Sequence, residues 1–277
     1  MKYSIWRQSR RIENEYLKTL YTLCDMFKKI AQSVGEDQAL YMQRMNQFQN
    51  SYQYEKYIMS AVKRMVTPIA DINAKTWREA ARKSTRGRFL YDLLMEELKQ
   101  GKDVLINDQL LENAALIRTL PNDVAEKVVK DIADEALKGK RARSIGKIIR
   151  QETDKHSRAS ARLIARTEVA KTQSALTRVR AQSLDMQWYV WRTALDGNRV
   201  RPSHRLMESV LVNWNDPPSP EALAGEKSVG NYHAGNIWNC RCFSEVLVDI
   251  DDVKWPHKVY RNGQIQMMSK SEFSNLL

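Results

Sequence analysis

The chain has 277 residues, of which 43% are hydrophobic, enough to bury the core of one large domain or of two ordinary ones. The N-terminus lacks the apolar core of a signal peptide, and no run of about 18 apolar residues occurs, so the sequence predicts neither secretion nor membrane insertion. Three cysteines are too few for a disulfide framework. We therefore expect a globular protein that folds in the cytosol.

The first two thirds of the chain predict helices in series. Between residues 10 and 34, apolar side chains recur every three or four positions, which is one stripe of an amphipathic helix. Pro68 is expected to end the next helix, because proline lacks the N–H group that continues a helix. The predicted helices are 10–34, 52–66, 88–98, 104–120, 121–137, 144–151 and 157–183.

The pattern changes after Leu184. Aromatic and β-branched residues alternate in 187–194 and predict a strand, and 242–249 has the composition of a second strand. A short helix is expected over 202–208, and Asn-Gly between two alternating runs predicts a β-hairpin over 258–267. The sequence thus predicts an α+β fold with a mostly α-helical N-terminal domain, residues 1–155, and a small β-containing C-terminal module, residues 156–277.

The net charge of +12 is concentrated in one segment. Residues 140–182 carry twelve Lys or Arg and three acidic residues. Such a segment could face the phosphates of DNA, an acidic protein partner, or solvent alone. The candidate residues for binding DNA or a partner are Arg141, Arg143, Lys147, Arg150, Arg158, Arg162, Arg166, Lys171, Arg178 and Arg180.

The C-terminal module holds the side chains that could bind a metal. Two thiolates with one or two imidazoles are ligands that zinc takes in structural sites. A Cys-x-Cys pair is a weaker signal than two Cys-x-x-Cys knuckles, because both sulfurs reach one ion only if the backbone curls. A structural zinc site and a metal-free, hydrogen-bonded cluster therefore both stay open. The candidate ligands are Asp196, His204, Cys240 and Cys242, and the role of His233 is left open.

The sequence points to no catalytic residues. Nothing in the spacing positions a Cys–His pair for nucleophilic attack, and no glycine loop of a nucleotide-binding type occurs. A metal-dependent nuclease would use the same candidate ligands, but paired acids of the kind that hold magnesium are not grouped with them. A DNA-binding regulator would need a recognition-helix motif, which we do not find. We expect a non-enzymatic protein, with a nuclease as the alternative.

Several short motifs in the C-terminal half resemble a known family. They are Ala165-Arg-Thr-Glu168, a predicted strand that runs into Asp196, the segment Arg199–His204, and a glycine ahead of Asn239-Cys-Arg-Cys242. In this order and spacing they resemble the Mu F-like minor head proteins, or head-morphogenesis proteins, of tailed phages, over about residues 155–250. Many relatives have a Pro-rich segment ahead of Cys-Arg-Cys, whereas this chain has Tyr232–Trp238. The positions that match the family pattern are Arg166, Glu168, Asp196, Arg201, His204, Cys240 and Cys242.

The resemblance implies a minor capsid protein, present in few copies, that is bound near the portal inside the head. It implies a role in head assembly and in DNA packaging or ejection, and no established reaction. The implied partners are the portal protein, the major capsid or scaffolding protein and non-specifically bound double-stranded DNA, with no membrane before infection. We expect the protein in the virion, at the portal vertex of the capsid interior, and in the host cytoplasm during assembly. Zinc is the one candidate cofactor.

Overall fold

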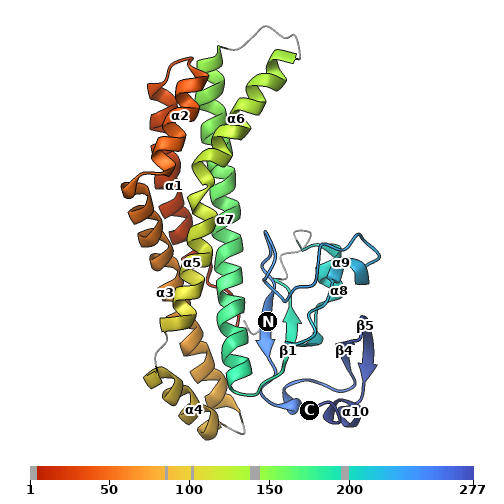
Figure 1. The fold of residues 1–277 in the computed structure, drawn as a ribbon. Coiled ribbons are helices and arrows are strands. Elements are labelled where there is room, and N and C mark those ends of the chain that lie inside the picture. The colour runs from red at the N-terminus through yellow and green to blue at the C-terminus, as the bar shows by residue number, and fades with distance from the viewer. Residues whose placement is uncertain (1–4, 85–86, 101–102, 138–143, 195–199) are drawn as a thin grey trace. The chain divides into compact units, whose positions relative to one another are not determined.

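The computed structural model describes residues 5–84, 87–100, 103–137, 144–194 and 200–277. In these residues long helices precede one five-stranded mixed sheet, which confirms the predicted α+β class (Figure 1). The helices are α1 (Arg10–Ser33), α2 (Gln38–Gln49), α3 (Tyr52–Lys83), α4 (Gly87–Gln100), α5 (Asp103–Arg118), α6 (Leu120–Leu137), α7 (Ile145–Ser183), α8 (Pro202–Leu206), α9 (Pro220–Leu223) and α10 (Lys270–Ser274). The strands are β1 (Trp188–Arg192), β2 (Val210–Asn213), β3 (Phe243–Val246), β4 (His257–Arg261) and β5 (Gln264–Met268).

The chain forms two compact units. A helical unit comprises Arg10–Thr67 and Ile106–Glu168, and a sheet-containing unit comprises the residues up to Ser9, Pro68–Leu105 and Val169–Leu277. The division falls inside α3, α5 and α7, which each contribute residues to both units. The two units are defined by which residues pack together. The domain boundary at residue 155 that the sequence predicts stays a prediction.

The helical unit is built on the predicted apolar stripe of α1. Figure 1 shows α1, α2 and α6 alongside the N-terminal part of α7. The buried polar groups are paired within this core: the Tyr54 hydroxyl donates to the Ile117 carbonyl at 2.5 Å, and the hydroxyls of Tyr41 and Thr153 lie 2.7 Å apart. The buried stripe of α1 consists of Ile12, Tyr16, Leu20, Leu23, Cys24, Phe27 and Ala31.

Two sequence predictions about helices were wrong, and one helix was not predicted. Pro68 does not end its helix, because α3 continues through it to Lys83. The predicted helices 144–151 and 157–183 are one helix, α7, since polar residues without Gly or Pro do not by themselves interrupt a helix and Thr153 is buried. The sequence also gave no indication of α2, whose segment is rich in Gln and buries only Tyr41 and Met45.

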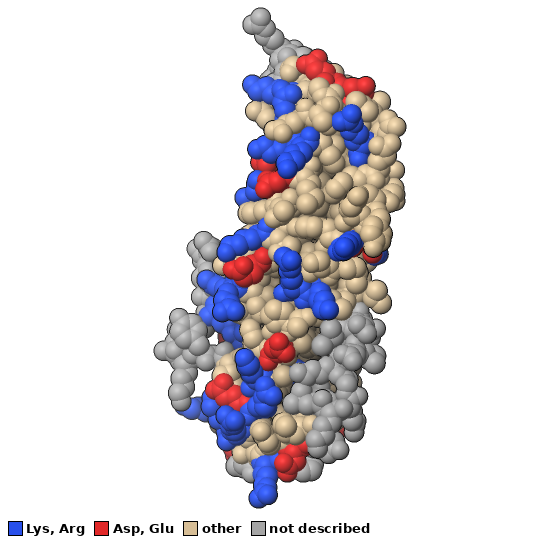
Figure 2. Space-filling view, turned by 90° about the vertical axis from the view of Figure 1, so that its left-hand side faces the viewer, with Lys and Arg blue, Asp and Glu red and all other residues tan. Residues whose placement is uncertain are grey.

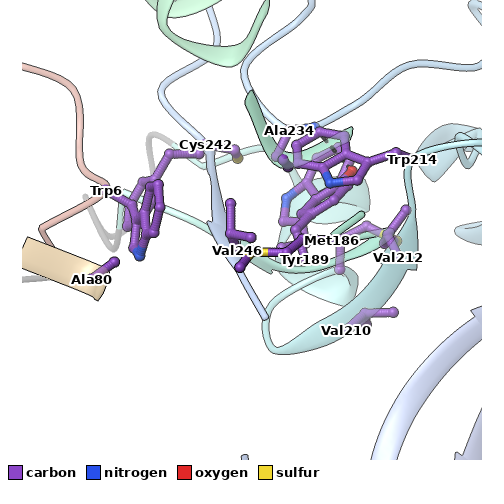
Figure 3. Close-up of a cluster of buried hydrophobic side chains, with 14 of the residues drawn as sticks. Trp6, Ala80, Met186, Tyr189, Val210, Val212, Trp214, Ala234, Cys242 and Val246 are labelled. Atoms are coloured by element: carbon purple, nitrogen blue, oxygen red, sulfur yellow. Dashed lines mark hydrogen bonds between the residues drawn. The ribbon is translucent and has the colours of Figure 1, made fainter. Parts of the chain in front are cut away.

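The sheet buries side chains on both faces. Its strand order is β3-β1-β2-β4-β5, with β2 and β4 parallel and the other neighbours antiparallel. Along β1, Tyr189 and Trp191 belong to one hydrophobic cluster, while Trp188 and Val190 belong to another. This alternation follows from the two-residue period of a strand. Figure 3 shows part of the first cluster, in which Tyr189 lies beside Trp214.

The predicted strands are confirmed with shorter bounds, and the predicted hairpin is confirmed with one more residue at each end. The segments 187–194 and 242–249 contain β1 and β3, and the short helix expected over 202–208 is α8. The hairpin joins β4 to β5 through Asn262 and Gly263, whose φ angles of 50° and 79° fit the left-handed geometry that Asn-Gly favours. The sequence did not predict β2, which lies between β1 and β4 in the sheet.

The N-terminal segment packs within the sheet-containing unit. The Trp6 and Trp77 rings meet edge to face with centroids 5.0 Å apart, and Figure 3 shows Trp6 near Ala80. The Gln8 side chain donates to the Cys242 carbonyl at 2.6 Å, and Arg7 donates to the Ala194 carbonyl at 3.1 Å. Residues from opposite ends of the chain thus complete one core. Among the described residues, no helix combines the length and the apolar character that a membrane span needs.

Candidate metal centre

Three of the predicted ligands meet in the sheet-containing unit. His204 comes from α8, and Cys240 and Cys242 come from the loop that leads into β3. The His204 Nδ1 atom lies 3.5 Å from the Cys240 sulfur and 3.4 Å from the Cys242 sulfur. All three ligand atoms lie within 4.8 Å of one another, and the side chains are buried. This is the chemistry of a Cys₂His metal site.

The backbone curls as a Cys-x-Cys pair requires. Asn239, directly before Cys240, has a φ angle of 56°, in the left-handed region that Asn tolerates. The Cys242 N–H donates to the Cys240 sulfur across 3.3 Å. Gly235 allows the close approach, because a Cβ there would lie 2.8 Å from the Cys242 carbonyl oxygen. The loop therefore turns both sulfurs toward His204.

The other nitrogen of His204 is held by a buried tyrosine and a carboxylate. Its Nε2 lies 2.9 Å from the Tyr232 hydroxyl, which donates to Glu221 with distances of 2.7 and 2.8 Å to the two carboxylate oxygens. A carboxylate only accepts, so the single proton of Tyr232 goes to Glu221, and the Tyr232 oxygen accepts from His204 Nε2–H. The Nδ1 atom of His204 then carries a lone pair directed at the two sulfurs.

The two thiols are unequal. Cys242 donates a hydrogen bond to the sulfur of Cys240, and this lowers the pKa of Cys240 well below its usual value, with a further contribution from His204. The same hydrogen bond, together with burial, raises the pKa of Cys242. Cys240 is therefore the more acidic of the two thiols.

His233 does not join these three ligands. Its Nδ1 lies 3.2 Å from the Tyr189 hydroxyl, and its ring packs against Trp214 with centroids 5.1 Å apart. Burial, with the nearby Arg178, lowers the pKa of His233 to about 4, so it is a neutral core residue at pH 7. Asp196, the fourth predicted ligand, lies outside the described residues.

Tyr232 and Glu221 were not predicted from the sequence. They lie 28 and 17 residues from His204 along the chain, and no motif links those positions. Pro220 begins the short helix α9, which the sequence did not predict, and places Glu221 in its first turn. Only the folded chain brings this carboxylate to the histidine.

A second cluster of ligand types lies in the helical unit. Asp131 of α6 and His156 of α7 approach to 2.6 Å between carboxylate and Nε2, with Glu152 beside them. All three are half-buried, and Glu152 also pairs with Lys155 at 2.6 Å. These contacts are those of an ordinary ion-pair group on two packed helices.

Several of the predicted DNA- or partner-binding residues are engaged within the protein. Arg158 pairs with Asp25 at 2.9 Å and with Asp154 at 3.0 Å. Arg166 lies 3.5 Å from Glu13, and Arg162 donates to the Tyr21 hydroxyl at 2.9 Å. Their charges are partly compensated locally, which reduces the attraction for phosphates. Lys147 and Arg150, in contrast, are exposed.

Arg180 does not belong to a surface for DNA. It is 5% exposed and donates a short hydrogen bond to Asn73, which in turn donates to Thr177 at 2.8 Å. We therefore correct its assignment from a binding residue to a buried structural residue. Arg178 and Lys171 are half-buried. Arg141 and Arg143 lie outside the described residues.

Positive charge does not form one unbroken patch on the face in Figure 2. There, Lys and Arg side chains are numerous, and Asp and Glu lie among them. Mixed charges of this kind weaken long-range attraction for DNA relative to a uniformly basic surface.

Comparison with known proteins identifies the segment that contains the candidate metal centre. Residues 126–245 match the family described as Phage Mu protein F like protein. The chain carries a Mu F-like region. This region includes His204, Cys240 and Cys242, and the match confirms the resemblance drawn from the motifs.

One curated relative extends the comparison. An uncharacterized protein of Haemophilus influenzae is 24% identical over 170 residues, which are 61% of this chain and 35% of that protein. The chain therefore spans about a third of the length of this relative. No solved structure matches the chain.

Proposed function

We propose that this chain is a minor head protein of a tailed phage that binds near the portal, inside the head, and assists head assembly and the packaging or ejection of DNA. The observation that carries the proposal is the Mu F-like match over residues 126–245. In this proposal the partners are the portal protein and the major capsid or scaffolding protein, with DNA as a non-specific contact.

Two features of the chain support an adapter rather than an enzyme. The Cys₂His cluster is buried, with His204 2% exposed, so a substrate has no direct access to it. Long helices with exposed apolar side chains, among them Leu111 and Leu163, suit docking on other helical proteins. Incubation with plasmid and added zinc, magnesium or manganese should leave the DNA intact; cleavage that needs one of these metals would favour the nuclease alternative.

The decisive experiment locates and counts the chain in phage particles. Quantitative mass spectrometry would compare intact virions, emptied heads and particles assembled without portal, with portal and major capsid subunits as internal standards. We expect a few copies per virion that disappear with the portal. A copy number close to that of the major capsid protein would contradict the minor role, and unchanged copies in portal-free particles would contradict portal binding.

A further inference from the structure

We propose that His204, Cys240 and Cys242 bind one structural zinc ion, with Tyr232 and Glu221 as the outer partners that orient the histidine. This metal site goes beyond the proposed role in phage heads and does not depend on it.

The spacing of the ligand atoms fits zinc. A tetrahedral ion with Zn–N and Zn–S bonds of ordinary length separates a nitrogen from a sulfur ligand by about 3.6 Å. The two separations from His204 Nδ1 are 3.5 and 3.4 Å. A small inward or outward adjustment of the side chains is enough to admit the ion, and the fourth ligand is not part of the proposal.

The protonation pattern also fits a metal ligand. A histidine that binds a metal through one ring nitrogen commonly donates from the other nitrogen to a carboxylate or similar acceptor, which fixes its tautomer. Here the Nε2–H of His204 is directed to Tyr232, and Glu221 accepts from Tyr232 through both oxygens. Because these hydrogen bonds place the ring proton of His204 on Nε2, the Nδ1 atom that faces the sulfurs carries no proton.

The burial of the three ligand side chains favours a structural ion over a catalytic one. His204, Cys240 and Cys242 are 2%, 4% and 3% exposed. Cys242 also belongs to the hydrophobic cluster of the sheet, near Trp6 and Val246 in Figure 3. An ion here would join α8 to the loop before β3 and would hold two segments that are far apart in the sequence. Its binding would therefore stabilise the fold of this unit.

The first test measures metal content in the complete 277-residue chain, produced in zinc-supplemented medium and purified without a metal-binding tag. Native mass spectrometry and elemental analysis should find one zinc ion per chain. The double variant Cys240→Ser/Cys242→Ser should lose this ion. Cys24→Ser is the matched control, because Cys24 is also buried but lies outside the cluster, and it should retain one zinc. Zinc-free wild type, or full zinc content in the double variant, would overturn the proposal.

A second measurement keeps the test informative if the cysteine variants do not fold. Cobalt added to the metal-free wild-type chain should give visible bands of a tetrahedral ion and near-ultraviolet thiolate charge-transfer absorption. Tyr232→Phe and Glu221→Gln, checked for folding by circular dichroism, should weaken zinc binding about 10- to 100-fold in competition with a chelator. Folded variants with unchanged zinc affinity would remove the outer partners from the proposal. Absence of the thiolate band would leave a metal-free thiol–imidazole cluster as the correct description.

Discussion

Gly235 is a residue where backbone geometry and close packing coincide. Its φ angle is 83°, and a Cβ would lie 2.8 Å from the Cys242 carbonyl oxygen. We expect Gly235→Ala to lower the free energy of unfolding by about 2–3 kcal/mol, because left-handed strain adds to the displacement of the Cys242 backbone. Urea unfolding followed by tryptophan fluorescence would measure this loss.

Gly225 provides the matched control for that substitution. Its φ angle of 75° is similar, but no atom lies within 4 Å of the position of a Cβ. Gly225→Ala should therefore cost only the backbone strain, about 1 kcal/mol. Equal losses in the two variants would show that contact with Cys242 has no role.

His233 should make stability depend on pH. Its pKa falls from 6.5 to about 4 on folding, so the unfolded chain binds more protons between these values. The contribution of neutral His233 to the free energy of unfolding is then fully present above pH 6.5. It decreases as the pH falls toward 4, by about 3 kcal/mol at most. As the pH is lowered from 6.5 to 4, the urea midpoint of unfolding should fall less steeply for His233→Gln than for the wild type. Parallel pH profiles would contradict the buried neutral state of His233.

At the scale of elements, α3 tolerates a proline in its interior. Pro68 has no N–H for the helical hydrogen bond, which costs up to about 3 kcal/mol in a regular helix. Pro68→Ala should therefore raise the free energy of unfolding by about 1–2 kcal/mol, and with it the urea midpoint. The gain is smaller than the cost of the proline because alanine also gives the unfolded chain more conformational freedom.

Pro202 is the control for this substitution, since it occupies the first turn of α8, where no helical hydrogen bond is lost. Pro202→Ala should lower stability slightly, by about 0.5–1 kcal/mol. A lower midpoint for Pro68→Ala as well would mean that packing of α3 requires the proline geometry.

At the scale of the whole molecule, not all of the basic side chains behind the net charge of +12 are available to contact DNA. Arg158 and Arg166 are paired with acids, and Arg180 is buried. Lys147 and Arg150 are exposed near the start of α7 and are the best described candidates for phosphate contacts. Lys147→Glu/Arg150→Glu should weaken binding to any duplex sequence and reduce the salt dependence by about two phosphate contacts.

Lys28→Glu/Lys29→Glu changes the net charge equally on exposed positions of α1 and serves as the control. Binding to a labelled duplex, titrated at several salt concentrations, would compare the two variants. Equal effects would show that overall charge, rather than this part of α7, controls the interaction.

The sequence by itself determined the class of fold, most helices and the Mu F-like motifs. These depend on local patterns: the stripe of α1, the alternation in β1, and Asn262-Gly263 in the hairpin each carry their signal within one short segment. The three candidate metal ligands were also recognisable in the sequence, because His204, Cys240 and Cys242 are chemically distinctive. Local chemistry was misleading where context overruled it, as at Pro68.

Only the tertiary structure decided which of these residues act together. It brought His204 to the two cysteines, placed Tyr232 and Glu221 behind it, and moved His233 into the core beside Tyr189. It also showed that Arg180 is buried although its helix is strongly basic. The physical reason is that burial and hydrogen-bond partners are set by segments far apart in the chain, and spacing along a sequence does not record which distant residues meet.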